Sequence, residues 1–182
     1  SGEFNLNGQL TGVTDLDIAA DATVNLGSDE RVNNAAVVTN NGGTINLNGA
    51  EGVTTFKSTG QLGGTGTLTA ADYQLSYGAS TATGANLGVG RLVSGPGSIT
   101  LNGDAAAELV DVTSGELNLN GQLTGVTDLD VAADATVNLG SDERVNNAAV
   151  VTNNGGTINL NGAEGVTTFK STGQLGGTGT LT

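Results

Sequence analysis

The residues of this chain that could do chemistry are carboxylates. Three aspartates lie close together near its start, and three more recur in an identical setting further along the chain. The six candidates are Asp15, Asp17, Asp21, Asp128, Asp130 and Asp134. Carboxylate oxygens are hard ligands, and an Asp-x-Asp pair can supply two of them to one Ca²⁺. We therefore take these six as candidate metal ligands. Ca²⁺ is the one cofactor they suggest, although the EF-hand loop and the Gly-Gly-x-Gly-x-Asp repeat are both missing.

The composition excludes most other kinds of catalytic site. The chain has no His and no Cys, which excludes Ser-His-Asp and Cys-His nucleophiles and the usual zinc ligands. Glycoside hydrolysis needs two acids facing each other across a cleft, and Asp29 and Glu30 add to the acidic group. All these acids recur in the same surroundings later in the chain, which is typical of solvated turns. We expect no catalytic residue and no enzymatic activity. A polysaccharide-active enzyme is the least favoured alternative.

Two further sequence patterns suggest ligand binding rather than catalysis. Tyr73 and Tyr77 fall on one face of an extended segment, where aromatic rings could contact a sugar; the alternative is that they pack on the core. A Thr-x-Asn or Thr-x-Thr pattern precedes successive leucines, as in 44–47. It resembles the hydroxyl ladders of ice-binding solenoids, although β-propensity and Asn/Thr ladders also account for it. A carbohydrate- or ice-binding module is therefore an alternative function.

The chain is one segment written almost twice. Residues 1–69 recur as 114–182, and only two positions differ: Phe4 becomes Leu117, and Ile18 becomes Val131. Residues 1–113 are thus one complete unit, and 114–182 are a partial second copy. Such long-period repetition is typical of stacked, quasi-one-dimensional architecture. We expect one continuous solenoid, cut from a longer tandem array.

A shorter period inside the unit predicts the fold. Apolar–polar–apolar triplets recur at nearly regular steps, with Gly, Asn, Asp and Ser between them. The leucines that end them are Leu6, Leu26, Leu47, Leu68, Leu101, Leu119, Leu139, Leu160 and Leu181. Alternation of period two predicts half-buried strands. Because these strands recur about every 20 residues, the chain is predicted to be all-β, a parallel β-helix of about 20 residues per coil. A leucine-rich repeat and a disordered chain fit the spacing less well.

Two details of this prediction can be checked directly. Leu47 should stack between Leu26 and Leu68. The step from Leu68 to Leu101 is longer than all the others and includes the only proline, Pro96. We expect residues 70–97 to form one enlarged coil, or a coil with a protruding loop.

The net charge limits the partners. Eighteen acidic and five basic residues give a net charge of −13, which disfavours nucleic acid and anionic membrane surfaces. No apolar run is long enough to span a bilayer. We therefore expect neither nucleic-acid binding nor membrane insertion.

Several short motifs in residues 73–121 point to a family. They are Tyr73-x-Leu75, Asn86-Leu87-Gly88, Leu101-x-Gly103, Val110 with Val112, and Ser114-Gly115-x-Leu117. This run resembles repeats of bacterial autotransporter passengers and filamentous-haemagglutinin-like exoproteins. The near-identical tandem units are similar to those of giant biofilm-matrix adhesins exported by two-partner secretion systems.

The resemblance implies a fold and a function. It implies a right-handed β-helix that is secreted to the surface or extracellular matrix of a Gram-negative bacterium. It implies a structural stalk that extends an adhesive fibre. The partners it implies are neighbouring repeats of the same chain, with matrix polysaccharide or other cell-surface molecules as ligands.

Overall fold

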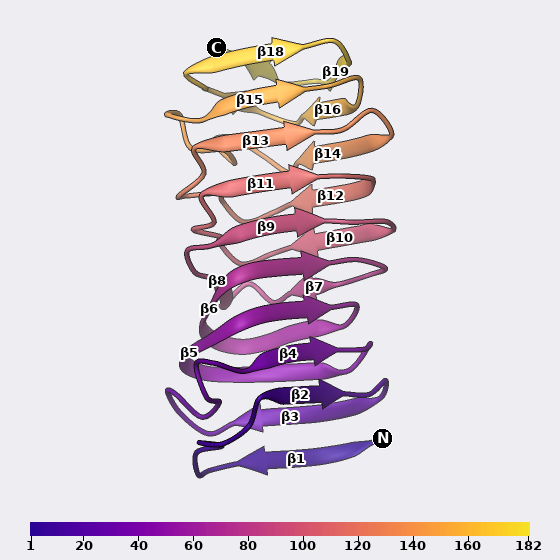
Figure 1. Cartoon of the computed structure of the whole chain (residues 1–182). Coiled ribbons are helices and arrows are strands. Elements are labelled where there is room, and N and C mark those ends of the chain that lie inside the picture. The colour runs from indigo at the N-terminus through magenta and orange to yellow at the C-terminus, as the bar shows by residue number, and fades with distance from the viewer.

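The computed structural model describes all residues, 1–182, and consists of strands and turns with no helix. Successive coils stack along one axis, with the two termini at opposite ends (Figure 1). Each strand pairs in parallel with the strand one coil away, as between β3 (Ala22–Leu26) and β5 (Thr44–Ser58). The predicted parallel solenoid is confirmed, with about nine turns of roughly 19 residues each. No helix of the structure is long and apolar enough to cross a membrane.

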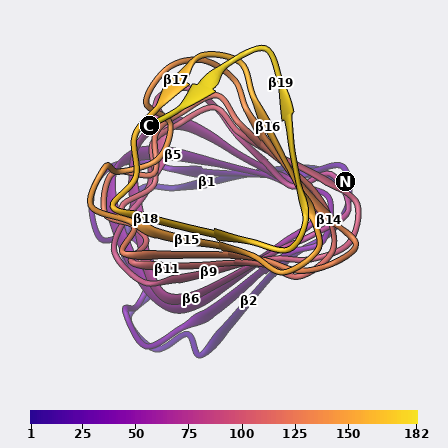
Figure 2. The same cartoon turned by 90° about the horizontal axis from the view of Figure 1, so that it is seen from above.

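The coils have three sides, so the solenoid is roughly triangular when seen along its axis (Figure 2). We call the sides wall A, wall B and wall C. Wall A contains β1 (Gly2–Leu6), β3, the first part of β5, the first part of β6 (Gln61–Leu75), β7 (Ser80–Thr81), β10 (Ser98–Leu101), β12 (Gly115–Leu119), β14 (Ala135–Leu139), β16 (Thr157–Leu160) and β19 (Gln174–Gly177).

Along the chain, each strand of wall B follows a segment of wall C. Wall B contains β2 (Asp15–Ile18), β4 (Val37–Asn40), the last parts of β5 and β6, β9 (Arg91–Ser94), β11 (Leu109–Val112), β13 (Asp128–Val131), β15 (Val150–Asn153) and β18 (Thr168–Ser171). In Figure 1 its strands run to the right in front, while those of wall A run to the left behind. Because the chain rises from the N-terminus to the C-terminus at the same time, the coil is right-handed.

Wall C has fewer strands than the other two sides. It contains the middle parts of β5 and β6, β8 (Ala85–Leu87), β17 (Ala163–Glu164) and β20 (Thr180–Leu181). Elsewhere it is reduced to single parallel bridges, such as those that link Leu87, Ala105, Leu123 and Val145 in succession.

The core is a set of apolar columns that run along the axis. On wall B the residues Val38, Phe56, Tyr73 and Leu92 lie in register in successive coils, and each is at most 3% exposed. Inward residues of all three walls join one hydrophobic cluster. Burial of apolar side chains contributes about 25 cal/mol per Å² removed from water. A coil therefore depends on its neighbours for most of its stability.

The register corrects the predicted leucine column. Leu47 lies opposite Gly64 on wall A, while Leu68 belongs to wall C, between Glu51 and Leu87. The prediction that Leu47 stacks on Leu68 was therefore wrong. Gly64 has φ of +77°, and an added Cβ would collide with the Leu47 carbonyl oxygen, so only glycine fits there. Because Gly64 occupies the position above Leu47 where a leucine was expected, the sequence pattern assigned Leu68 to that position instead.

The predicted enlarged coil is also absent. Residues 70–97 contain the end of β6, then β7, β8 and β9, and these continue walls B, A and C and return to wall B. Thr81 takes the inward position between Leu62 and Leu101 on wall A. The step from Leu68 to Leu101 is long because Leu68 lies on wall C and Leu101 on wall A, so the two leucines do not occupy equivalent positions.

Candidate functional site

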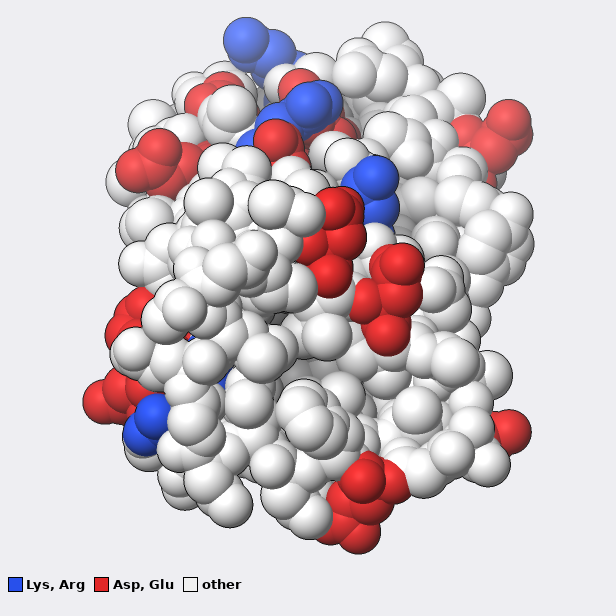
Figure 3. All heavy atoms as spheres, turned by 60° about the horizontal axis from the view of Figure 1, so that its bottom comes forward, with Lys and Arg blue, Asp and Glu red and all other residues white.

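The six candidate calcium ligands lie on the surface but do not converge. Asp15 and Asp17 are both exposed on β2, and Asp21 follows in the turn, where its φ is +60°. Asp128, Asp130 and Asp134 are exposed at the equivalent places of the second copy. No group of three acidic side chains is close enough to hold a metal ion. Figure 3 shows the acidic side chains of one face in small, separate groups.

Asp29 and its counterpart in the second copy have structural contacts. The Asp29 carboxylate accepts a hydrogen bond of 2.8 Å from the backbone N–H of Ala50, one coil further on. Asp142 accepts the same bond from Ala163. Both therefore tie the corner between walls A and C to the next coil.

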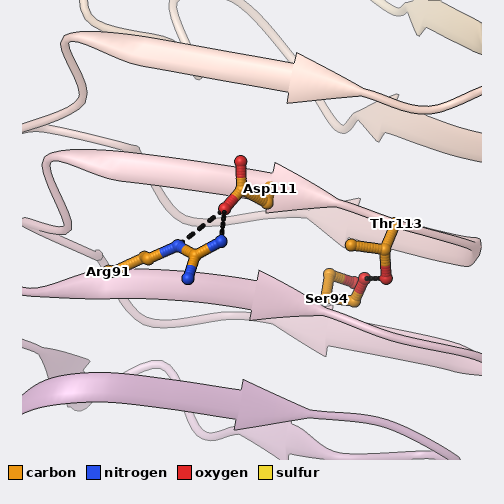
Figure 4. A network of polar contacts seen from close by, with 4 residues as sticks. All are labelled: Arg91, Ser94, Asp111 and Thr113. Atoms are coloured by element: carbon orange, nitrogen blue, oxygen red, sulfur yellow. Dashed lines mark hydrogen bonds and ion pairs between the residues drawn. The ribbon is translucent and has the colours of Figure 1, made fainter.

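One acid on wall B has a cationic partner. Arg91 on β9 forms an ion pair of 2.6 Å with Asp111 on β11, and its Nε also donates to the same oxygen at 2.8 Å (Figure 4). Beside this pair, the Thr113 hydroxyl donates to the Ser94 carbonyl at 2.9 Å. Arg91 is half exposed, so the pair contributes only about 0–1 kcal/mol. The arrangement joins two coils and presents no free catalytic group.

The two tyrosines do not share a surface. Tyr73 is fully buried, and its hydroxyl accepts from the Ala70 N–H at 2.9 Å and donates to the Leu68 carbonyl at 2.8 Å. Burial raises the pKa of Tyr73 to about 12. Tyr77 is 69% exposed in a turn with φ of +48°. The two rings therefore form no shared ligand-contacting face: Tyr73 packs in the core, as the alternative interpretation held, and Tyr77 alone reaches solvent.

The predicted Thr-x-Asn surface exists only in part. Thr23 and Thr44 are in register on wall A, but the next position is Gln61, and Thr65 lies instead opposite Asn48 near the corner. The asparagine column forms two separate ladders. Asn25 donates to Asn5 and Asn46 donates to Asn25, at 2.8 and 2.7 Å. The second copy has the same ladder through Asn118, Asn138 and Asn159.

A surface groove with a volume of about 540 Å³ runs along the end of wall B. Outward side chains of four successive coils line it, namely Thr39, Lys57, Gln74 and Val93, with Arg91 beside them. The turns that follow these strands add Asn41, Thr59, Ser76 and Pro96. Seven of the thirteen lining residues carry a hydroxyl or amide side chain, and none is Asp or Glu. It offers hydrogen bonds to a polar ligand, but no pair of carboxylates for glycoside hydrolysis.

Two buried glutamates were missed by the sequence interpretation. Glu51 is 2% exposed on wall C, and its carboxylate accepts the backbone N–H groups of Arg31 and Val32 at 2.8–3.1 Å. Glu164 accepts the same groups of Arg144 and Val145. Burial is the largest effect on each carboxyl and raises its pKa, although the backbone hydrogen bonds oppose this.

A signal for these glutamates was present in the sequence. Glu51 alternates with Val53, just as Leu68 alternates with Ala70 one coil later, and both pairs point inward. The surrounding glycines concealed this alternation. Each glutamate closes the corner of the coil before it, so its role is structural.

Comparisons with known proteins identify no relative. No protein-family model, no curated protein and no solved structure matches this chain.

Proposed function

We propose that this chain is a structural stalk segment of an extracellular bacterial adhesin, and that it extends a cell-surface or biofilm-matrix fibre. The observation that carries the proposal is the repetition of coils in the structure. Thr23 pairs with Thr44 in the first copy, and Thr136 pairs with Thr157 in the second. Likewise Asp15 pairs with Val37, and Asp128 with Val150. Each added unit therefore repeats the same coils.

The coils are suited to a mechanical role. Backbone hydrogen bonds link each coil to the next over walls A and B, and one apolar cluster runs inside them. Adjacent coils lie about 4.8 Å apart, so a unit of five or six coils adds roughly 25–30 Å of length. Length is then set by the number of units. The net charge of −13 keeps neighbouring rods apart through repulsion.

Deletion of whole units from the parent fibre tests this proposal. Removal of one complete unit preserves the register, because Thr113 is followed by the same Ser-Gly-Glu sequence that begins the chain. Fibre length, measured by electron microscopy, should fall linearly with the number of units removed. The affinity of a terminal binding domain should stay constant. If adhesion instead follows the number of units at fixed fibre length, the repeats bind the ligand themselves and the stalk proposal fails.

The groove on wall B supports a second candidate, binding of a matrix polysaccharide. Its hydroxyl, amide and cationic groups match the hydrogen-bonding groups of a sugar chain. The variant Gln74→Ala should then weaken glycan binding in a titration, while Gln122→Ala, outside the groove, should not. Ice binding is less well supported, because Gln61 interrupts the threonine column. Thermal hysteresis of the purified chain tests it, and we expect none.

A further inference from the structure

Tyr77 has a backbone conformation that the neighbouring coils give to glycine. It lies in the turn that leads from wall B to wall A, and its φ is +48°. Gly97 lies directly over it, since an added Cβ would come within 2.7 Å of the Tyr77 Cα, and Gly115 lies over Gly97. These glycines have φ of +92° and +70°. A bulky residue at positive φ is strained, whereas glycine is not. The tyrosine is therefore unfavourable for the fold itself.

The Tyr77 side chain is at the edge of the groove on wall B. Tyr77 follows Ser76, which lines the groove, and its N–H donates to the carbonyl of Pro96, also in the lining, at 2.7 Å. The side chain is 69% exposed, so packing within the chain does not explain it. Backbone strain at an exposed residue is typical of a binding site. An exposed aromatic ring offers an apolar face to the C–H groups of a sugar while its hydroxyl stays in water.

The groove also contains a cation without a partner. Lys57 is exposed and forms no ion pair, whereas Arg91 is paired with Asp111. Asp72, on the strand above, lies outside the lining. The outward residues in register with Lys57 through the groove are uncharged, namely Thr39, Gln74 and Val93. A free ammonium among hydroxyl and amide groups favours a ligand that carries a carboxylate.

We propose that the groove on wall B binds an acidic polysaccharide, a chain of sugars that carry carboxylates. Lys57 pairs with a carboxylate, Gln74 and its neighbours form hydrogen bonds with sugar hydroxyls, and Tyr77 stacks on the apolar face of a sugar ring. Because the net charge of the chain is −13, most of its surface repels such a ligand. This proposal rests on the second candidate function, glycan binding in the same groove, and names its ligand class and contacts.

Titration calorimetry of the purified chain tests the ligand class. The probes are oligomers of polygalacturonate, alginate and hyaluronan, each compared with the same oligomer after reduction of its carboxylates to alcohols. At least one acidic oligomer should bind about tenfold more tightly than its reduced form. Added salt should diminish this preference, because it screens the charge of an exposed lysine.

Variants of Lys57 test the ion pair. Lys57→Gln should lower the affinity for the acidic oligomer about tenfold and leave the affinity for the reduced oligomer unchanged. Lys57→Arg keeps the charge and should keep the preference for the acidic form. Lys170→Gln is the matched control: it removes the same charge from an identical local sequence outside the groove, and it should change neither affinity.

Variants of Tyr77 separate binding from folding. Tyr77→Gly removes the ring and relieves the strain at positive φ, so the melting temperature should not fall. The affinity for the acidic and the reduced oligomer should both fall about tenfold, because the ring contacts the sugar and not its carboxylate. Tyr77→Phe keeps the ring and should bind normally. A lower melting temperature with normal affinity in Tyr77→Gly would show that the role of the ring is structural.

The outcomes distinguish the ligand class from glycan binding in general. If acidic and reduced oligomers bind equally, the acidic class is wrong and the groove remains a site for neutral glycans. If no oligomer of either kind binds, both are wrong. If Lys170→Gln weakens binding as much as Lys57→Gln does, the attraction is one of overall charge and the groove is not the site. None of these results affects the stalk proposal, which fibre length tests separately.

Discussion

The two copies of residues 1–69 have nearly the same sequence but different neighbours. Residues 44–58 form one continuous strand, β5, paired along its length with β6. The identical residues 157–171 form three short strands: β16 and β17 lie beneath the short strands β19 and β20, and β18 has no strand above it. The sequence is constant, so the difference arises from what lies above it. In a solenoid the next coil decides how far a strand extends.

Near their N-terminal ends the two copies differ in the opposite sense, because here the second copy is the better covered one. Leu10 and Leu16 of the first copy are only partly buried, while Leu123 and Leu129 of the second are each 1% exposed. The first pair lies in the terminal coil, and the second pair has coils on both sides. Burial therefore follows position along the axis.

Other features are the same in both copies and so are local. The Asn40 side chain donates to the Gly43 carbonyl at 3.1 Å, and Asn153 donates to Gly156 at the same distance. Glu51 and Glu164 likewise accept equivalent backbone groups. Turns and corners thus depend on their own sequence, whereas wall packing depends on the neighbouring coil.

The largest expected difference between the two copies is the loss of stability when one phenylalanine, Phe56 or its counterpart, is replaced. Phe56 is 1% exposed beneath Tyr73, while its counterpart Phe169 is only partly buried. Phe56→Ala should lower the free energy of unfolding by about 3–5 kcal/mol. Phe169→Ala should cost much less, because solvent already reaches the side chain. Urea denaturation of both variants measures the difference, and equal losses would show that the neighbouring coil does not set burial.

The next effect concerns the segment that covers only the first copy. Tyr73→Phe removes the hydroxyl that accepts from Ala70 and donates to Leu68. The Leu68 carbonyl still accepts from the Gly88 N–H at 2.8 Å, but the buried Ala70 N–H loses its hydroxyl partner, which should cost about 1–3 kcal/mol. Backbone hydrogen exchange should accelerate at Ala70 and stay unchanged in the second copy, residues 114–182. An unchanged exchange rate at Ala70 would contradict the assigned hydrogen bond.

The buried glutamates predict a pH dependence shared by both copies. The pKa values of Glu51 and Glu164 are raised in the folded chain above the ordinary value of 4.5. Their contribution to stability is therefore fully present below pH 4.5 and is lost as pH rises through the folded pKa values. The melting temperature should rise as pH is lowered from neutral toward 4.5.

A matched control separates this effect from net charge. Glu51→Gln and Asp15→Asn each remove one negative charge, but only Glu51 is buried. The pH dependence of the melting temperature should be shallower in Glu51→Gln and unchanged in Asp15→Asn. If both variants behave alike, general repulsion explains the dependence and the buried carboxyls do not.

The sequence predicts the architecture well but the register less well. Alternation around residues such as Val24 and Leu26 predicts half-buried strands, because apolar side chains must point to one side, and the recurrence of these strands about every 20 residues predicts parallel coils. The alternation could not show that Leu68 belongs to wall C, because all walls use the same alternating pattern. On wall A, Gly64 occupies the position where a leucine was expected. The candidate acids were correctly placed on the surface. Their lack of convergence depends on strand positions that the pattern leaves open.

The smallest effect should be equal in the two copies. Asn25 donates to Glu3 and Asn5 and accepts from Asn46, and Asn138 has the equivalent three partners. These contacts lie on the outer face of wall A, so they depend little on whether the rod continues. Asn25→Ala and Asn138→Ala should each cost about 0.5–1.5 kcal/mol. Urea denaturation of the two single variants measures each loss. If only Asn138→Ala destabilises the chain, the N-terminal coil frays in solution, and the ladder needs a coil on both sides just as the core does.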